Sequence, residues 1–258
     1  MKQKVFKVVL ALLYCSAGLS PAYAGSRCTR DMMKSGTTCV DTYEASVWRI
    51  PNPLDINKSL VKKVQKGRAT AEALTAGGAT QLGTAGDDYA PCNDDGQNCT
   101  NDIYAVSVSG VQPARSITWF QAQLACKNAQ KRLPSDAEWQ SAVAGTPDGA
   151  PCNVASAGTS ATGSAAGCIS SDGAFDMVGN LFEWVADWVP LSTACVGWGS
   201  FSDDQQCLAG ADTSTTGGPG AVVRGGHFAA GSGAGPLNVV GNVRPSDASA
   251  VLGFRCAR

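Results

Sequence analysis

Histidine is almost missing from the sequence, and its scarcity excludes several kinds of catalytic site. The 258 residues contain a single histidine, His227. A metal site built from three histidines, or from two histidines and a carboxylate, is therefore excluded. A Ser-His-Asp triad would need His227 as its base, yet no serine lies in a G-x-S-x-G turn. In this setting His227 is more typical of a contact residue than of a catalyst.

Charge and phosphate-binding motifs are scarce as well. Lys and Arg number 20 against 21 Asp and Glu, and no basic stripe is evident, so nucleic acid is not an expected partner. The glycine runs lack a following lysine and a strand-to-helix context, so no phosphate-binding loop is expected. Abundant glycine with little charge favours a loop-rich fold over a helical bundle.

The N-terminal segment has the features of a secretory signal peptide. Three lysines precede a short apolar run, and a small-x-small cleavage site ends at Ala24. This pattern predicts a signal peptide over residues 1–24 and one mature domain over 25–258. A lipid anchor on Cys15 is the alternative, but the tyrosine before it is too large for a lipobox. No later stretch predicts a membrane span, so we expect a secreted, periplasmic or cell-envelope protein.

Cysteine is abundant by contrast, with eleven residues in the chain. Ten remain once Cys15 leaves with the signal peptide, and an even number in an exported protein predicts disulfides. No C-x-x-C motif occurs, which argues against a zinc site or a thioredoxin-like motif. Pairs that close short loops are favoured, although other connectivities stay open. The favoured pairs are Cys28–Cys39, Cys92–Cys99, Cys152–Cys168 and Cys195–Cys207, which leave Cys126 and Cys256 as the fifth pair.

Two helices are predicted in the middle of the chain. Thr118 is a suitable N-cap for a helix over 119–130. A second helix begins after Ser135, which forms a capping box with Glu138, and it is closed by Gly145. The buried side of this second helix is predicted to carry Trp139 and Val143.

Short strands and long loops are predicted around these helices. The segment 39–50 alternates enough to form an early strand, and 104–111 and 221–224 are shorter candidates. Residues 51–103 show little pattern and are interpreted as a partly ordered insertion. Surface loops are expected at 146–167 and 210–220, and core positions of the early strand at Tyr43, Val47 and Ile50.

The stretch 172–188, DGAFDMVGNLFEWVADW, combines apolar bulk with a polar turn. Aromatic residues surround Gly179-Asn180, and Asp176 and Glu183 flank this turn. Polar groups in so apolar a setting indicate a specific role. Carboxylates alternating with backbone carbonyls suit a hard cation such as calcium. The alternative is a core turn that the two acids simply cap.

Four stretches in the same order carry a family resemblance. DMVGNLFEW resembles the G-N-x-W-E-W signature of the sulfatase-modifying factor family, which includes the formylglycine-generating enzymes. The resemblance implies an α+β, C-type-lectin-like fold with two helices in the predicted order. It also implies that a Cys126–Cys256 disulfide ties a helix to the C-terminal strand. The three further matches are CVDTYEAS at 39–46, KRLPSDAEWQSAVAG at 131–145, and RGG…GFRCAR between 224 and 258.

The resemblance also implies a structural calcium ion, and it indicates which two positions would carry the copper-binding cysteines of an oxidase. Carried over residue by residue, the calcium ligands are the side chains of Asp176 and Glu183 and the carbonyls of Gly179 and Leu181. Enzymes of the family use two cysteines after R-G-G to bind copper and oxidise a sulfatase cysteine to formylglycine. The matching positions here are Ala230 and Gly235, so no copper is expected. Iron-dependent sulfoxide synthases, a second branch, need a histidine cluster that this chain lacks.

The segment between RGG and GFRCAR has an unusual composition. Residues 227–252 lack Lys, Glu, Gln, Met and Trp altogether, which a short segment can also do by chance. The segment resembles the variable region of diversity-generating retroelement target proteins, which share this fold and end near GFRC. That resemblance implies a rigid base that presents a ligand surface. The predicted contact residues are His227, Phe228, Ser232, Leu237, Asn238, Asn242, Arg244 and Asp247.

These observations favour an exported, non-catalytic protein that binds a protein or glycan ligand at a surface. The first alternative is an oxidoreductase of the same family that acts on a protein cysteine. It would need a metal site built from other residues. The second alternative is a structural component of an envelope or pilus assembly. The sequence predicts neither the ligand nor the oligomeric state.

Overall fold

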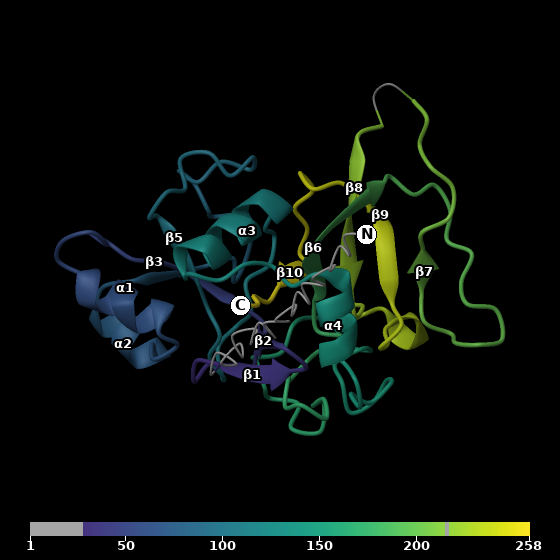
Figure 1. Cartoon of the computed structure of the whole chain (residues 1–258), viewed down its shortest axis with the longest axis horizontal. Helices are drawn as coiled ribbons and strands as arrows, with labels where there is room; N and C mark the ends of the chain where they lie inside the picture. The colour runs from purple at the N-terminus through teal and green to yellow at the C-terminus, as the bar shows by residue number, and fades with distance from the viewer. Residues whose placement is uncertain (1–27, 215–216) are drawn as a thin grey trace, which may run out of the picture.

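The computed structural model describes residues 28–214 and 217–258. The predicted signal peptide over 1–24 lies outside the described residues. Of the helices that are described, none is long and apolar enough to cross a membrane. Four α-helices and ten strands of the described chain alternate with long loops (Figure 1). This content confirms the α+β class.

A five-stranded sheet forms the half of the molecule that contains the 227–252 segment (Figure 1). The strand order is β10-β6-β8-β9-β7, with β6 antiparallel to β8, β8 antiparallel to β9, and the two outer pairs parallel. The 227–252 segment therefore contains β9 and reaches β10, which pairs with the strand of the FEW motif. The strands are β6 Phe182–Pro190, β7 Gln206–Cys207, β8 Pro219–Arg224, β9 Val239–Val243 and β10 Leu252–Phe254.

The predicted early strand over 39–50 is two strands rather than one. Between them, Glu44 turns inward and is fully buried, and its carboxylate accepts from Asn180 and from the Leu181 amide. Residues 42–45 belong to neither strand, so the alternation of the sequence continues across a break in the strand. Val47 and Ile50 are buried as predicted, whereas Tyr43 is half-buried and stacks on Phe175. The strands are β1 Met32–Ser35 with β2 Thr38–Asp41, and β3 Ser46–Arg49 with β4 Thr80–Leu82 and β5 Ile103–Val106.

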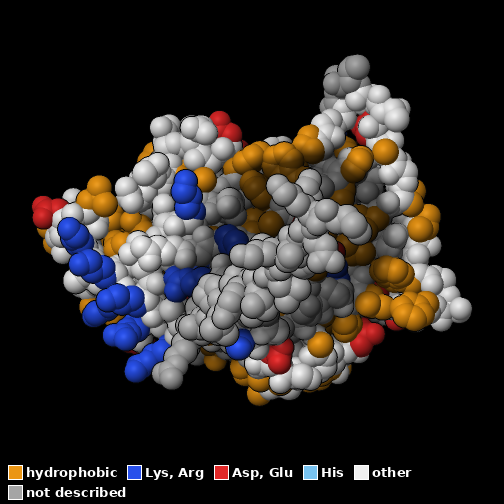
Figure 2. All heavy atoms as spheres, viewed as in Figure 1, with side chains coloured by type: hydrophobic (Ala, Val, Ile, Leu, Met, Phe, Trp, Pro, Cys, Tyr) orange, Lys and Arg blue, Asp and Glu red, His pale blue; other side chains and the backbone are white. Residues whose placement is uncertain are grey.

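The insertion over 51–103 is more ordered than its sequence predicts. It contains α1 (Lys58–Gln65), α2 (Ala71–Ala76) and β4, which pairs with β3. Helix α1 places three aliphatic side chains in a core cluster with Trp48 and Tyr104. Four lysines at and just after α1 are exposed, and Figure 2 shows them gathered on this end of the molecule, where the sequence predicted no basic stripe. These lysines are Lys58, Lys62, Lys63 and Lys66.

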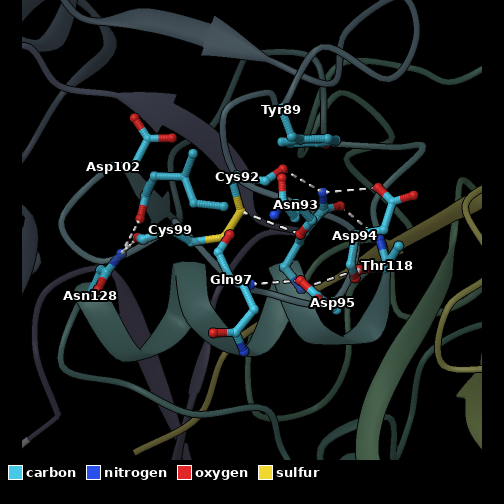
Figure 3. Close-up of a disulfide and its surroundings, with 12 residues drawn as sticks. Tyr89, Cys92, Asn93, Asp94, Asp95, Gln97, Cys99, Asp102, Thr118 and Asn128 are labelled. Atoms are coloured by element: carbon cyan, nitrogen blue, oxygen red, sulfur yellow. Dashed lines mark hydrogen bonds between the residues drawn. A yellow bond between two sulfur atoms is a disulfide. The ribbon is translucent and has the colours of Figure 1, made fainter.

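The Cys92–Cys99 loop at the end of the insertion is attached to the next helix (Figure 3). The Asn128 side-chain amide donates to the Cys99 carbonyl at 3.1 Å, and the Thr118 hydroxyl donates to the Asp94 carbonyl at 2.6 Å. These bonds hold the loop at both ends of that helix. They fix Asp94 beside the C-terminal part of the chain.

Both predicted helices are confirmed. Helix α3 spans Trp119–Asn128 and α4 spans Asp136–Ala142, and each begins with a capping box. The helices stop before the predicted ends because Gln130 and Gly145 adopt positive φ angles of 60° and 81° in the turns that follow. Trp139 and Val143 are fully buried, as the spacing predicts.

All five predicted disulfides are confirmed. Cys126 of α3 joins Cys256, two residues after β10, and this bond closes a separation of 130 residues. The predicted loop over 146–167 is also observed, stapled by Cys152–Cys168. It is not purely a surface loop, because the side chains of two of its own residues, Val154 and Thr162, are buried.

Candidate ligand-binding surface

The candidate surface rests on a buried ion pair. Arg255 is fully buried and donates to both carboxylate oxygens of Glu183, at 2.7 and 2.6 Å. Trp139 of α4 donates its indole N–H to the same carboxylate at 2.7 Å. Arg255 also donates to the carbonyls of Asp41 and Phe175. Arg255 and Glu183 therefore connect the C-terminal end of the chain to β6, to α4, to the Asp41 backbone and to the Phe175 backbone. These contacts hold the end of β10 and the start of β6 in place in the five-stranded sheet.

The Gly179-Asn180 turn lies directly next to this pair. Gly179 has a φ of 74°, and a Cβ there would overlap the carbonyl oxygen of Asn153. Asn180 has a φ of 57°, and its side-chain oxygen accepts from the Asn153 side chain and from the Ser160 amide. The side-chain amide of Asn180 donates to Glu44. A glycine followed by an asparagine is therefore what the turn requires.

The four residues predicted to bind calcium do not fit an ion in this arrangement. Both oxygens of Glu183 accept hydrogen bonds from Arg255 and Trp139, so the guanidinium supplies the positive charge assigned to the ion. Asp176 accepts from the Gly163 amide at 2.6 Å, and burial raises its pKa to about 6. The Gly179 and Leu181 carbonyls would complete the predicted set.

The 227–252 segment is anchored to this core at its start. Arg224, just before it, is 4% exposed, lies 4.6 Å over the Trp139 ring and donates to Asp136 at 2.5 Å. The Phe228 amide donates to the Asn180 carbonyl at 3.0 Å. At the far end, β10 pairs with β6, and Arg255 and Cys256 hold the chain end. The backbone is therefore fixed at both ends of the segment.

The predicted contact residues divide by exposure. Ser232, Asn242 and Arg244 are exposed, and four others are partly exposed. Asn238 is fully buried, and its side-chain amide donates to the Gly233 carbonyl at 2.7 Å. The prediction of Asn238 as a contact residue is therefore wrong, because this side chain fastens a backbone turn from inside. The partly exposed residues are His227, Phe228, Leu237 and Asp247.

Two cavities flank the segment. One, here called the end cavity, has a volume of about 550 Å³ and is lined by Asp94, Phe182 and residues between 243 and 252, including Asp247. The other, here called the loop cavity, has a volume of about 480 Å³ and lies between residues 227–233 and the loop 195–206. Phe182 lines the end cavity and His227 lines the loop cavity, and their ring centroids lie 5.2 Å apart. The predicted residues His227 and Ser232 line the loop cavity.

The sequence analysis did not predict the residues that line the loop cavity opposite the 227–252 segment. Asp203, Asp204 and Gln205 line it, together with Cys195. The Leu237 amide donates to Asp204 at 2.6 Å, and backbone bonds join Gln205 to the segment. The adjacent acids Asp203 and Asp204, inside the loop closed by Cys195–Cys207, were the sequence feature that could have indicated this part of the site.

The residues of the 227–252 segment that line or adjoin the loop cavity determine which chemical groups the cavity contains. Ala230 lines it, and a Cβ on Gly235 would overlap the Asp204 carboxylate. Each of the ten described cysteines is in a disulfide, so no free thiol lies in the described part of the chain. Burial lowers the pKa of His227, whose Nδ1 accepts from the Ala229 amide, so this ring is neutral at pH 7. The cavity thus offers carboxylates, amides and a neutral imidazole.

Comparison with known proteins places the chain in a family. The model of the sulfatase-modifying factor enzyme 1-like domain matches residues 88–258. No curated protein sequence matches the chain. Among solved structures, the Major Tropism Determinant I1 variant has 18% identity and a TM-score of 0.51 over 88% of this chain. That match covers 52% of the determinant, so the chain spans about half of its length.

Two further structures are less similar to the chain. PvdO from Pseudomonas aeruginosa has 18% identity and a TM-score of 0.39, covering 90% of this chain and 99% of that protein. Treponema denticola variable protein 1 has 21% identity and a TM-score of 0.37, covering 57% of this chain and 71% of that protein. The determinant supports the C-type-lectin-like fold, and the family match spans well over half of the sequence. The chain therefore belongs to the sulfatase-modifying factor enzyme 1-like domain family.

Proposed function

We propose that this protein is an exported, non-catalytic binding protein that presents residues 227–252 to a ligand. The observation that carries the proposal is the contrast within the segment. Its ends are anchored to the buried Glu183–Arg255 core, whereas Ser232, Asn242 and Arg244 point to solvent beside two cavities. A fixed backbone with free side chains is suited to adaptable contacts.

The composition of the surface supports a protein or glycan ligand. The aromatic rings of His227 and Phe228 pack edge to face with centroids 5.5 Å apart, and the exposed Ser232 and Asn242 add small polar side chains to the same segment. Aromatic and small polar side chains are typical of binding surfaces that accept varied ligands. This composition is also in keeping with the proposed role as a diversity-generating retroelement target.

Export is part of the proposal. Five disulfides are typical of proteins that mature in an oxidising compartment. Together with the predicted signal peptide, they support a secreted, periplasmic or cell-envelope location. Cleavage after Ala24 is checked by N-terminal sequencing of the protein recovered from culture medium and periplasm.

Matched substitutions test the binding role. The purified protein is applied to glycan arrays and to arrays of cell-surface proteins, and its signals are compared with those of S232R and N242R. We expect these variants to lose at least tenfold in affinity for a ligand of the wild type, because each adds a long cation to the surface. S59R is the matched control, since Ser59 is exposed on α1, at the other end of the molecule (Figure 1). Equal binding by all three variants would contradict the proposal.

One observation favours an oxidoreductase as the second candidate. Cys195, half of the Cys195–Cys207 disulfide, lines the same cavity as Ala230. A substrate thiolate would attack the Cys195 sulfur, forming a mixed disulfide and releasing the Cys207 thiolate. A second substrate thiolate would release the substrate disulfide, and dioxygen would have to reoxidise the Cys195–Cys207 pair for turnover. Thiol loss and oxygen uptake with a cysteine peptide, with and without copper, separate the two functions. We expect no turnover, and catalysis that C195S/C207S abolishes would establish the second candidate instead.

A further inference from the structure

Three carboxylates converge at the wall of the loop cavity. One oxygen from each of Asp148, Asp203 and Asp204 lies within 4.8 Å of the others. No other group of three His, Cys, Asp or Glu side chains meets this criterion among residues 28–214 and 217–258. The three come from two loops, one after α4 and one closed by Cys195–Cys207. Like charges at this separation repel each other unless a cation lies between them.

A second observation distinguishes this cluster from an ordinary acidic surface. Asp204 is 2% exposed, and its Oδ1 has no hydrogen-bond partner, while Oδ2 accepts from the Leu237 amide. A buried carboxylate oxygen without a partner is costly and needs a compensating group. Arg224, whose charge interacts with that of Asp204, donates its hydrogen bonds instead to Asp136, Gln140 and the Pro236 carbonyl. Among the described residues, no Lys or Arg forms a salt bridge with Asp204, so no cation of the protein directly offsets this buried charge.

We propose that Asp148, Asp203 and Asp204 bind a hard divalent cation such as calcium at the wall of the loop cavity. Three carboxylates supply only oxygen donors, which are the ligands that calcium and magnesium prefer. Asp148 and Asp203 are exposed, so the ion reaches the site from solvent. Water completes the coordination on the cavity side.

The bound cation joins three parts of the chain. Asp148 belongs to the loop after α4, and Asp203 and Asp204 belong to the loop that forms the cavity wall. Asp204 also holds the Leu237 amide of the 227–252 segment. The cation therefore fixes the cavity wall against the segment. The effect rests on the cluster alone and holds whether or not the segment binds a ligand.

Calorimetric titration of the disulfide-intact protein, stripped with EDTA, tests the site with calcium and magnesium chloride separately. We expect one saturable site for calcium, with a dissociation constant of about 10⁻⁴ to 10⁻³ M, as in extracellular calcium modules. D148N and D203N, both at exposed positions, are expected to weaken it at least tenfold. D172N changes an exposed acid outside the cluster and is the matched control.

The melting temperatures of the same variants give a second readout. The difference between variant and wild type is expected to change sign between EDTA and calcium. In EDTA, D203N is expected to melt at or above the wild-type temperature, since one repelling charge is gone. In calcium the order reverses, because only the wild type gains stability from the ion. The proposal is overturned if neither ion binds below 10 mM (on the order of ten times the weakest affinity expected), or if D148N and D203N bind like the wild type. Loss of binding in D176N alone would move the ion to the Gly179-Asn180 turn and overturn it as well.

Discussion

The Glu183–Arg255 pair is expected to be the most sensitive point of the fold. Glu183 is 1% exposed and Arg255 is not exposed at all, and three hydrogen bonds converge on the carboxylate. Glu183→Gln keeps the shape but removes the carboxylate charge that Arg255 is bonded to, leaving only Glu44 and Asp176 as further acids acting on the guanidinium. Breaking a buried pair in this way costs about 3–5 kcal/mol. This is a large part of the roughly 5–15 kcal/mol that stabilises a typical domain.

Urea unfolding at pH 7, followed by tryptophan fluorescence, measures the loss. The matched control is Arg132→Gln, which breaks the Arg132–Glu138 pair, whose side chains are 45% and 22% exposed. An exposed pair contributes about 0–1 kcal/mol, so the control should change little. The reasoning is refuted if Glu183→Gln loses no more than the control. A loss seen only in the presence of calcium would show instead that Glu183 is a calcium ligand, as the family resemblance implies.

Three further predictions concern the disulfides, the pH dependence and the turn. Removing Cys126–Cys256, which closes 130 residues, should cost about 5 kcal/mol, against about 2.4 for Cys92–Cys99, which closes 7; equal losses in urea unfolding would contradict the loop-entropy account. Burial raises the pKa of Asp176 to about 6, so the folded state binds the proton more tightly than the unfolded chain and stability falls as pH rises from about 4 to 6. D176N should therefore match the wild type at pH 4 and exceed it by up to about 3 kcal/mol at pH 7.5, and a constant difference across this range would exclude the effect. G179A, which puts a Cβ against the Asn153 carbonyl at positive φ, should lose about 1–3 kcal/mol in the same assay, and an unchanged midpoint would show that the turn relaxes.

The sequence predicts those elements whose signals are local. The capping box of Ser135 and Glu138 lies within four residues, and the helix forms where it predicts. The disulfide pairs that close short loops follow from proximity along the chain, and the fifth pair remains by elimination. Helix ends are predicted less well, because Gln130 and Gly145 belong to turns that only the three-dimensional packing defines.

Residues that depend on distant partners are not predicted. Glu44 looks like an ordinary polar position of a strand, yet it lies buried against Asn180, 136 residues away. Helix α1 has no side-chain N-cap, but the spacing of Leu60, Val61 and Val64 was an available amphipathic signal, and these residues pack in a cluster with Trp48 and Tyr104. Asn238 has the composition of a contact residue, but its direction is set by the turn at Gly233. The convergence of Asp148 with Asp203 and Asp204 likewise requires two loops to meet.

The distribution of these contacts explains how one segment could change while the fold stays. Backbone groups of the segment make the bonds that hold it, such as the Phe228 amide to Asn180 and the Leu237 amide to Asp204. Backbone amides are unaffected by a change of side chain, unless proline is introduced. The side chains that do anchor the region, Arg224 and Arg255, lie just outside 227–252. Within it, the fully buried Asn238 side chain carries a bond that substitution would remove, and Ala234, Val239, Val240 and Leu252 are buried in the core. Diversification of the segment would therefore have to keep Asn238 and these buried apolar residues while altering the exposed positions.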